Sequence, residues 1–241
     1  MIAVLPMAGR GSRFSGSGYS QPKPLIPVDG TPMFAVALGS IAKLPVRKLI
    51  VITLEEHDEH YDASQLIKNY SPYPTEIIRL KDVTEGQLCT VMAAKEHIRL
   101  NEDILIVSSD TIIISNLHED ILNKRPDCKG LISVANMPGE CWSFAKTDST
   151  GRVIEVTEKV RISDQASTGL YYFSNGIEFC DLADEILSKK EKTKGEYYVI
   201  PVYQKYINRG DFVGVSVATH MWDMGTPESL QHYFSARENQ E

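Results

Sequence analysis

Short apolar runs and longer segments with helical spacing follow one another along this chain. The apolar runs, bounded by turn residues, predict β-strands near residues 2–7, 48–54, 75–80, 103–108, 130–135, 142–147, 152–157, 168–174 and 212–218. Apolar residues spaced as on one helix face predict helices near residues 31–44, 60–69, 86–99, 116–123, 176–190 and 197–209. Because strands and helices alternate in the first half, the pattern predicts βαβ units and a largely parallel sheet.

This order of elements predicts an α/β fold with a Rossmann-like sheet, mixed but mainly parallel, flanked by helices. The short strands of the second half predict a small subdomain beside the main sheet. No linker, internal repeat or low-complexity segment divides the sequence, so we expect one domain over residues 1–241. In such a sheet, ligands gather at the carboxyl ends of the strands.

A glycine-rich, basic loop follows the first strand directly. Glycines stand at positions 9, 11, 16 and 18, and the loop carries Arg10, Arg13 and Lys23. Without a Cβ, glycine lets backbone N–H groups turn toward an anion that comes close to the chain. The loop therefore predicts polyphosphate binding. Phe14 replaces the third glycine of a dinucleotide-binding loop, and Ser17 stands where a P-loop needs lysine, so both of these motifs are disfavoured.

Composition and charge exclude several other classes of protein. The net charge of −7, from 25 basic and 32 acidic residues, argues against a nucleic-acid partner. No run reaches the roughly 18 apolar residues of a membrane span, so no membrane partner is expected. The first apolar run lacks a basic leader, which favours a core strand over a signal peptide, and we expect a cytoplasmic enzyme. The 4 cysteines form no C-x-x-C pair, which favours reduced thiols.

Two aspartates are candidate metal ligands. Asp110 ends the buried run that starts at Ile104, which places its carboxylate at the end of a parallel strand, where Mg²⁺ could bind beside phosphates. The alternative is that Asp110 merely caps the following turn. Asp223 precedes Thr226 and Pro227, which suit the start of a helix. Helix capping accounts for Thr226 and Pro227 but gives no reason for an aspartate at position 223. Residues 57–60, His-Asp-Glu-His, fit a solvated helix face better than a metal site.

These segments resemble the signature of the sugar-1-phosphate nucleotidylyltransferases of the NTP transferase superfamily. The family's A-G-x-G-x-R and P-K-P-L segments are matched by Ala8–Arg13 and Pro22–Leu25, and Trp222–Glu228 resembles a third family segment. The resemblance implies a GT-A-like nucleotidyltransferase fold. Residues 1–125 would form mainly its nucleotide-binding half, and residues 126–241 mainly its acceptor-binding half with the second metal ligand.

The resemblance implies roles on the nucleotide side. Arg13 and Lys23 would be the catalytic cations, in contact with the triphosphate and the leaving pyrophosphate. Asp110 and Asp223 would share the Mg²⁺ cofactor. The nucleotide-binding residues would be Leu5, Met7, Ala8, Gly9, Gly11, Ser12, Arg13, Gly86, Gln87 and Ser109. The Gln87 amide offers both a donor and an acceptor to a base edge; the alternative is that Thr84 and Glu85 simply start the next helix.

On the acceptor side, the resemblance implies binding by Glu158, Lys159, Gly169 and Glu196. Lys159 would meet the acceptor phosphate, Glu158 an acceptor polar group, and the Gly169 backbone would lie against the ligand. Val160 replaces the family's usual proline, and Ser109 replaces the glycine that usually precedes the strand-end aspartate. The alternative for Glu158 and Lys159 is a surface pair at a strand end.

The implied reaction joins an NTP to a phosphorylated small molecule, most often a sugar 1-phosphate, and releases pyrophosphate, commonly for surface-glycan synthesis. Because the second pKa of a phosphate monoester is about 6, the acceptor is already ionised and needs no protein base. The runner-up function is a cytidylyltransferase for a non-sugar phosphate such as phosphocholine. A third candidate is a catalytically silent nucleotide-sensing subunit. The sequence leaves the base and the acceptor open and is compatible with a homo-oligomer.

Overall fold

A computed structural model describes residues 1–9 and 11–238; Arg10, part of the glycine-rich loop, lies outside the described residues. Those residues contain a ten-stranded sheet. Its main path has the order β5-β4-β1-β6-β11-β8-β12-β7, and its remaining strands, β9 and β10, join this path where β9 pairs with β11. Its strands are β1 (Ile2–Pro6), β4 (Lys48–Leu54), β5 (Thr75–Leu80), β6 (Ile104–Ile106), β7 (Thr111–Ser115), β8 (Cys128–Ala135), β9 (Ser143–Thr147), β10 (Val153–Glu158), β11 (Gln165–Phe173) and β12 (Phe212–Asp223). A separate two-stranded sheet pairs β2 (Pro27–Val28) with β3 (Thr31–Pro32).

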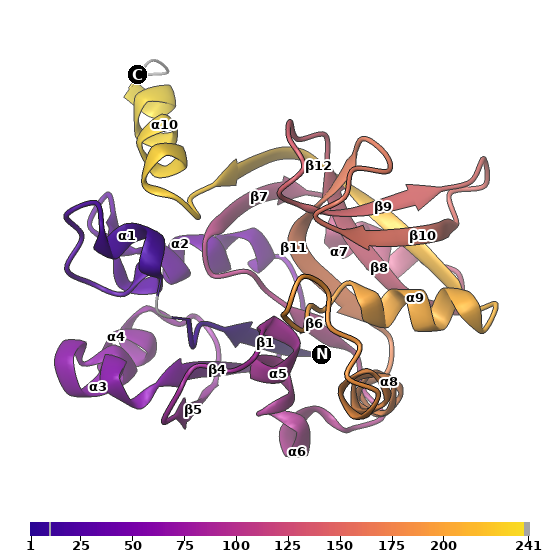
Figure 1. The fold of residues 1–241 in the computed structure, drawn as a ribbon, viewed down its shortest axis with the longest axis horizontal. Coiled ribbons are helices and arrows are strands. Elements are labelled where there is room, and N and C mark those ends of the chain that lie inside the picture. Colours follow the sequence, from indigo (N-terminus) through magenta and orange to yellow (C-terminus); the bar gives the residue numbers. More distant parts are fainter. Residues whose placement is uncertain (10, 239–241) are drawn as a thin grey trace.

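The sheet is mixed, as the order of elements over the whole chain predicts. Strands β5, β4, β1 and β6 run parallel, and β8 runs parallel to β12. Strand β11 is antiparallel to both β6 and β8, and β7 is antiparallel to β12. The β9–β10 hairpin stands beside the main sheet (Figure 1), where the sequence predicts a small subdomain.

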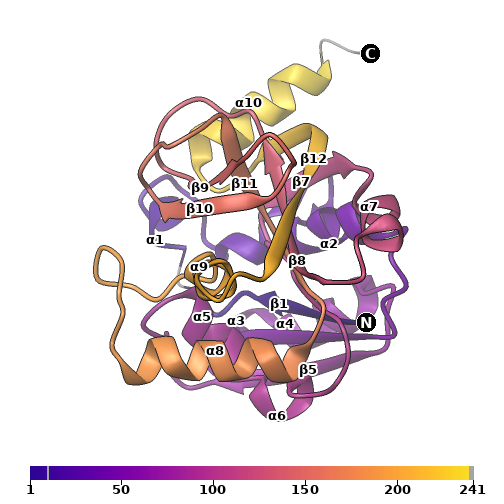
Figure 2. The same cartoon turned by 90° about the vertical axis from the view of Figure 1, so that its right-hand side faces the viewer.

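Helices cover both faces of the sheet (Figures 1 and 2). They are α1 (Ser12–Ser15), α2 (Met33–Leu38), α3 (Glu55–Tyr61), α4 (Ala63–Tyr70), α5 (Gln87–Met92), α6 (Lys95–Ile98), α7 (Leu117–Asn123), α8 (Gly176–Ser188), α9 (Pro201–Asn208) and α10 (Pro227–Glu238), with 3-10 turns at Lys23–Leu25 and Gly39–Ile41. Among the described residues, no helix is long and apolar enough to span a membrane.

Strand β1 shows why these elements stack in layers. Its residues Ile2 and Val4 join one apolar cluster with α5, α8 and α9, whereas Ala3 and Leu5 join a second cluster with α2, α4 and α7. Successive side chains of a strand point to opposite faces, so a strand covered on both faces reads as one continuous apolar run. That is the pattern from which β1 was predicted.

The structure differs from the predicted elements at several places. The predicted helix 86–99 is two short helices, α5 and α6, and the predicted helix 31–44 begins only at Met33 because Thr31 and Pro32 are extended in β3. Strand β7 was not predicted. It is an edge strand whose partner, β12, lies about a hundred residues further along the chain, so local periodicity carries little information about its pairing.

Candidate active site

The two N-terminal signature segments pack directly on each other. Gly11 has a φ of 60°, and a Cβ on it would lie 2.9 Å from the Cβ of Lys23. Only glycine combines this conformation with so close a neighbour. The 3-10 turn at Lys23–Leu25 then directs the Lys23 ammonium to the Asp110 carboxylate, with which it forms an ion pair through Oδ2.

Asp110 lies in the turn between β6 and β7 and is surrounded by donors. Its Oδ1 accepts hydrogen bonds from the Ser108 hydroxyl and, at 3.3 Å, from the Thr111 hydroxyl. Burial alone would raise the pKa of the Asp110 carboxyl, but the charge of Lys23 and these hydrogen bonds bring that pKa below its ordinary value. Asp110 is therefore ionised at neutral pH.

Asp223 reaches the same place from the other end of the chain. It ends β12, where it pairs with Thr111 of β7, and the Met224 N–H donates to the Asp110 carbonyl oxygen at 2.8 Å. A Cβ on Gly225 would lie 2.9 Å from Oδ1 of Asp223 and 3.1 Å from Oδ2 of Asp110. One oxygen of each carboxylate thus lies beside Gly225. Burial, and then the negative charge of Asp110, raise the pKa of Asp223.

A small apolar cluster holds the N-terminal and C-terminal segments together. Phe14 and Met33 from the first segment pack with Met224, Leu230 and Tyr233 of the last. Figure 1 shows α10 above α1 and α2, where this contact is made. The apolar residues around the candidate motifs therefore bring together charged side chains that are far apart in the sequence.

Glu158 and Lys159 lie on the hairpin side of the cleft. Glu158 ends β10, is only 7% exposed and accepts a hydrogen bond from the Ser143 hydroxyl. Burial is the main cause that raises its pKa. The Lys159 ammonium donates to the Tyr198 hydroxyl, which in turn donates to the Glu196 carboxylate at 2.6 Å.

Gly169 joins the two sides of the cleft. It has a φ of 87°, and a Cβ on it would lie 2.7 Å from the Cβ of Ser108, the residue that donates to Asp110. Its carbonyl oxygen accepts from the Ser108 N–H at 3.1 Å. A glycine is needed here so that β11 can approach the strand end that carries Asp110.

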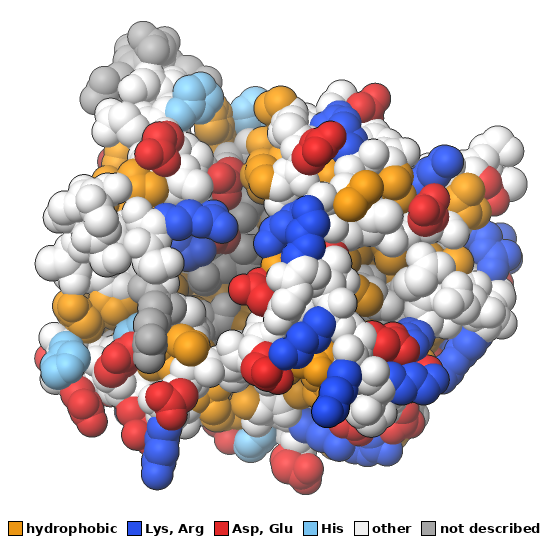
Figure 3. All heavy atoms as spheres, viewed as in Figure 1, with side chains coloured by type: hydrophobic (Ala, Val, Ile, Leu, Met, Phe, Trp, Pro, Cys, Tyr) orange, Lys and Arg blue, Asp and Glu red, His pale blue; other side chains and the backbone are white. Residues whose placement is uncertain are grey.

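The carboxylate cleft, as we name it, holds about 510 Å³, within the range of small-molecule sites. Its lining includes most of the predicted catalytic, metal and acceptor residues: Arg13, Asp110, Glu158, Lys159, Gly169, Glu196 and Asp223. Figure 3 shows this face of the molecule hollowed near its centre, with basic side chains on both sides of the hollow. Lys23 reaches this cleft through its contact with Asp110.

The glycine-loop cleft adjoins it and holds about 480 Å³. Five of the predicted nucleotide-binding residues line it: Ala8, Gly9, Ser12, Gly86 and Gln87. Glu196 lines both clefts, so the two are neighbours. Gly11 lines a further cavity of about 360 Å³ on the side of α3. The side chains of Leu5, Met7 and Ser109 are 0%, 2% and 7% exposed and line none of these three cavities.

Several residues that the sequence did not single out as site residues also line the carboxylate cleft. They are Ser108, Trp142, Ser143, Thr168, Tyr171 and Tyr198. Ser108 had a usable signal, because it stands two positions before Asp110 and alternate residues of an extended segment share a face. The contact between Tyr198 and Lys159 could not be predicted, because it joins segments about forty residues apart.

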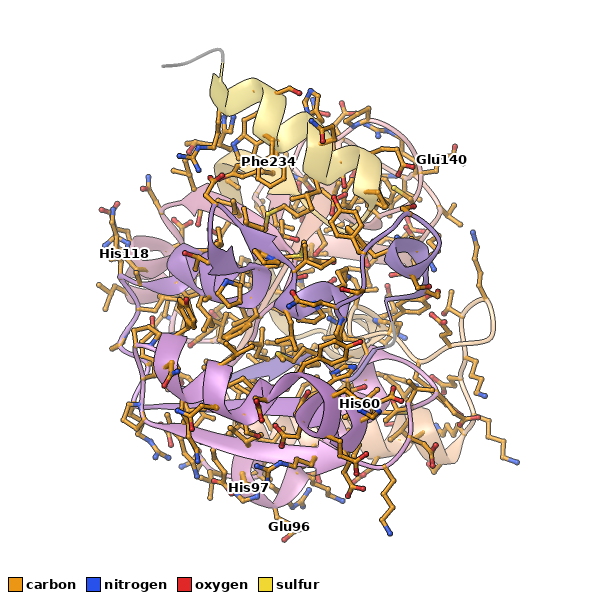
Figure 4. The ribbon with its side chains drawn as sticks, turned by 90° about the vertical axis from the view of Figure 1, so that its left-hand side faces the viewer. His60, Glu96, His97, His118, Glu140 and Phe234 are labelled. Carbon is orange, nitrogen blue, oxygen red and sulfur yellow. The ribbon has the colours of Figure 1, made fainter. Side chains whose placement is uncertain are left out.

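The candidate metal ligands among the described residues are two carboxylates, Asp110 and Asp223. No group of three or more His, Cys, Asp or Glu side chains among residues 1–9 and 11–238 could hold a metal alone. Figure 4 shows His60, His97 and His118 well separated. His57 is buried with Nδ1 3.2 Å from the Thr53 hydroxyl, so the prediction of a solvated face over residues 57–60 is wrong at this position. Magnesium needs only one or two carboxylates when phosphates and waters complete its shell.

Gly86 lines the glycine-loop cleft, and its close packing against the Tyr197 backbone can be tested. Gly86 has a φ of 136°, and a Cβ there would lie 2.4 Å from the carbonyl oxygen of Tyr197. We expect Gly86→Ala to lower the free energy of unfolding by about 3 kcal/mol. Gly195→Ala, at a φ of 88° in open space, is the matched control and should cost about 1 kcal/mol. Equal losses in urea unfolding would contradict the close packing of Gly86 on Tyr197.

Comparison with known proteins places the chain among nucleotidyltransferases. The family model described as nucleotidyl transferase matches residues 2–240. The bifunctional protein GlmU of Methanococcus aeolicus is 25% identical over 235 residues, which are 95% of this chain and 53% of that protein. This chain therefore spans about half the length of GlmU. The UTP–glucose-1-phosphate uridylyltransferase AglF of Haloferax volcanii is 24% identical over 239 residues, 95% of this chain and 93% of AglF.

A solved structure supports the same assignment. A nucleoside-diphosphate-sugar pyrophosphorylase from Vibrio cholerae RC9 is 26% identical and superposes with a TM-score of 0.83 over 98% of this chain and 100% of that chain. The likeness confirms the α/β fold predicted from the sequence, with helices on both faces of a mixed sheet. Since the family model matches nearly the whole chain, the protein belongs to the nucleotidyl transferase family.

Proposed function

We propose that this protein transfers a nucleotidyl group from an NTP to a phosphorylated small molecule, a sugar 1-phosphate in the first place, and releases pyrophosphate. The observation that carries the proposal is the pair of carboxylates, Asp110 and Asp223, that line one cleft beside Lys23, next to the glycine-rich loop. Family membership supports the reaction class. The activity named for AglF, which this chain matches over 93% of its length, supports a sugar phosphate as acceptor.

In this mechanism an acceptor phosphate oxygen forms a bond to the α-phosphorus of the NTP while the bond from that phosphorus to the pyrophosphate oxygen breaks. The loop around Ala8, Gly9 and Ser12 binds the triphosphate through backbone N–H groups, as loops of this kind do. Arg13 and Lys23 stabilise the charge that spreads over the phosphates. Because the acceptor phosphate arrives ionised, no side chain has to remove a proton.

Asp110 and Asp223 fit a magnesium ion. An oxygen of each carboxylate lies beside Gly225. Burial, and then the negative charge of Asp110, raise the pKa of Asp223, and a cation would offset both effects. When bound, Mg²⁺ would neutralise phosphate charge and help to orient the triphosphate. The chain's own part is to hold the Asp110 carboxylate in place, through the hydroxyl groups of Ser108 and Thr111.

Lys159 provides a test of the acceptor side. In the proposed site it binds the acceptor phosphate, so Lys159→Met should raise the KM for the acceptor about tenfold or more and leave the KM for the NTP within twofold. Steady-state kinetics with the other substrate at saturation measures both constants. Lys146→Met, an exposed position on β9, is the control and should change neither. Equal rises in both KM values for Lys159→Met would remove Lys159 from the acceptor site.

The function itself is tested by pyrophosphate release in the presence of Mg²⁺. Each common NTP is combined with a panel of sugar 1-phosphates, phosphocholine and other phosphorylated small molecules. Release with one NTP and a sugar 1-phosphate would support the proposal and identify both substrates. Release only with a non-sugar phosphate would replace the acceptor but keep the reaction class. Binding of an NTP without release from any combination would favour a nucleotide-sensing protein.

A further inference from the structure

The ion pair between Lys23 and Asp110 occupies the position where the proposed function needs a metal ion. The two oxygens of Asp110 are used differently. Oδ1 accepts from Ser108 and Thr111, whereas Oδ2 pairs with the Lys23 ammonium. Oδ2 is also the oxygen that lies, with Oδ1 of Asp223, against Gly225. A cation shared by both carboxylates would therefore have to approach the same oxygen that Lys23 now contacts.

The Lys23 side chain can move away from Asp110 without a change in the fold. Its backbone and Cβ are fixed against Gly11, but its side chain is a flexible four-carbon stem that remains 24% exposed. The Asp110 side chain is 17% exposed. Movement of one side chain, with no change in the backbone, is enough to free Oδ2.

The charge balance of Asp110 and Asp223 also favours replacement of the Lys23 ammonium by a divalent cation. The Lys23 ammonium pairs with Asp110, and an oxygen of Asp223 lies beside the same oxygen of Asp110 at Gly225. Lys23 therefore compensates the pair only in part. A divalent cation carries enough charge for both carboxylates, and an NTP triphosphate offers the displaced ammonium group a new anionic partner.

We infer that Lys23 is a displaceable internal counter-ion, which holds the cation position of Asp110 in the nucleotide-free protein and moves to the triphosphate when metal and nucleotide enter. The inference rests on the proposed function, because it assumes that Asp110 and Asp223 hold the metal. Its consequence is that Lys23 weakens metal binding in the absence of nucleotide. Metal and nucleotide then assist each other's binding, since such coupling is reciprocal.

The test is a titration of the nucleotide-free protein with Mn²⁺, with free Mn²⁺ measured by electron paramagnetic resonance. Lys23→Met should bind Mn²⁺ about tenfold more tightly than the wild type, because a like charge next to the site is removed. Lys23→Gln, a second uncharged variant, should show the same strengthening. Lys189→Met removes an exposed lysine that pairs with Glu185 and lines neither cleft, and should leave Mn²⁺ affinity unchanged. Unchanged or weaker Mn²⁺ binding by both Lys23 variants would overturn the inference.

Asp110→Asn, introduced into the wild type and into Lys23→Met, separates this inference from the proposed function. Loss of Mn²⁺ binding with Asp110→Asn, together with tighter binding by Lys23→Met, supports both. Loss with Asp110→Asn but no strengthening by Lys23→Met overturns only the role of Lys23 as a counter-ion. Mn²⁺ binding that survives both Asp110→Asn and Asp223→Asn would show that the metal lies elsewhere. That result would overturn both the metal assignment and the inference.

Discussion

Replacing Asp223 by asparagine should lower the turnover of pyrophosphate release about a thousandfold and, at the same time, make the metal-free protein more stable. The loss of rate follows because one of the two carboxylates proposed to hold the metal is removed. The gain in stability follows because Asp223 is buried beside the charge of Asp110, which raises its pKa. A neutral amide of the same size relieves that repulsion. Steady-state kinetics and thermal unfolding in a chelator measure the two effects.

The pH dependence of the stability gain follows from the direction of the pKa shift. A carboxyl whose pKa is raised by folding favours its protonated form, so the wild type loses stability as the pH rises through that raised pKa. The gain for Asp223→Asn should therefore be present at neutral pH and vanish below about pH 4. For a chain of this length, each 0.5–1 kcal/mol gained in the free energy of unfolding raises Tm by about 2 °C. Asp164→Asn, on the surface with Arg161, is the control. A lower Tm for Asp223→Asn at neutral pH would contradict this account.

Much of the sheet could be predicted from the sequence because its central strands are buried on both faces. Strand β4 is an example, since all its residues from Leu49 to Leu54 are buried and all of them except Thr53 are apolar. Helix lengths were harder to predict. Nothing in the sequence marks the break at Ala93 and Ala94 between α5 and α6, because alanine is the residue most favourable to helix continuation.

The candidate site was predictable where one short segment carries both its fold signal and its chemistry. Asp110 is such a case, because the apolar strand β6 before it places it beyond the carboxyl end of a central strand. The contacts between segments were not predictable. The hydrogen bond from Lys159 to Tyr198 and the ion pair of Lys23 with Asp110 depend on how distant elements pack, which no local pattern encodes. The carboxylates could thus be identified from the sequence, but their electrostatic partners could not.

Replacing Lys23 by alanine should lower turnover about a hundredfold and destabilise the metal-free protein, the opposite stability change from Asp223→Asn. The rate falls because a cation proposed to stabilise the transferring phosphates is lost, and one such preorganised contact contributes roughly 3 kcal/mol. Stability falls because the buried Asp110 carboxylate loses its ion-pair partner. Lys189→Ala, which removes an exposed lysine paired with Glu185, is the control and should alter neither quantity appreciably.

The pH profile of Lys23→Ala distinguishes the loss of this ion pair from a general loss of packing. Folding lowers the pKa of Asp110, so the contribution of the pair is present above the ordinary aspartate pKa of about 3.9 and lost as the pH falls through the lower, folded value. The Tm difference between wild type and Lys23→Ala should accordingly be greatest near neutral pH and shrink in acid. A difference that stays constant from pH 7 to pH 3 would assign the effect to lost side-chain packing. In that case Lys23 would not be the group that keeps Asp110 ionised.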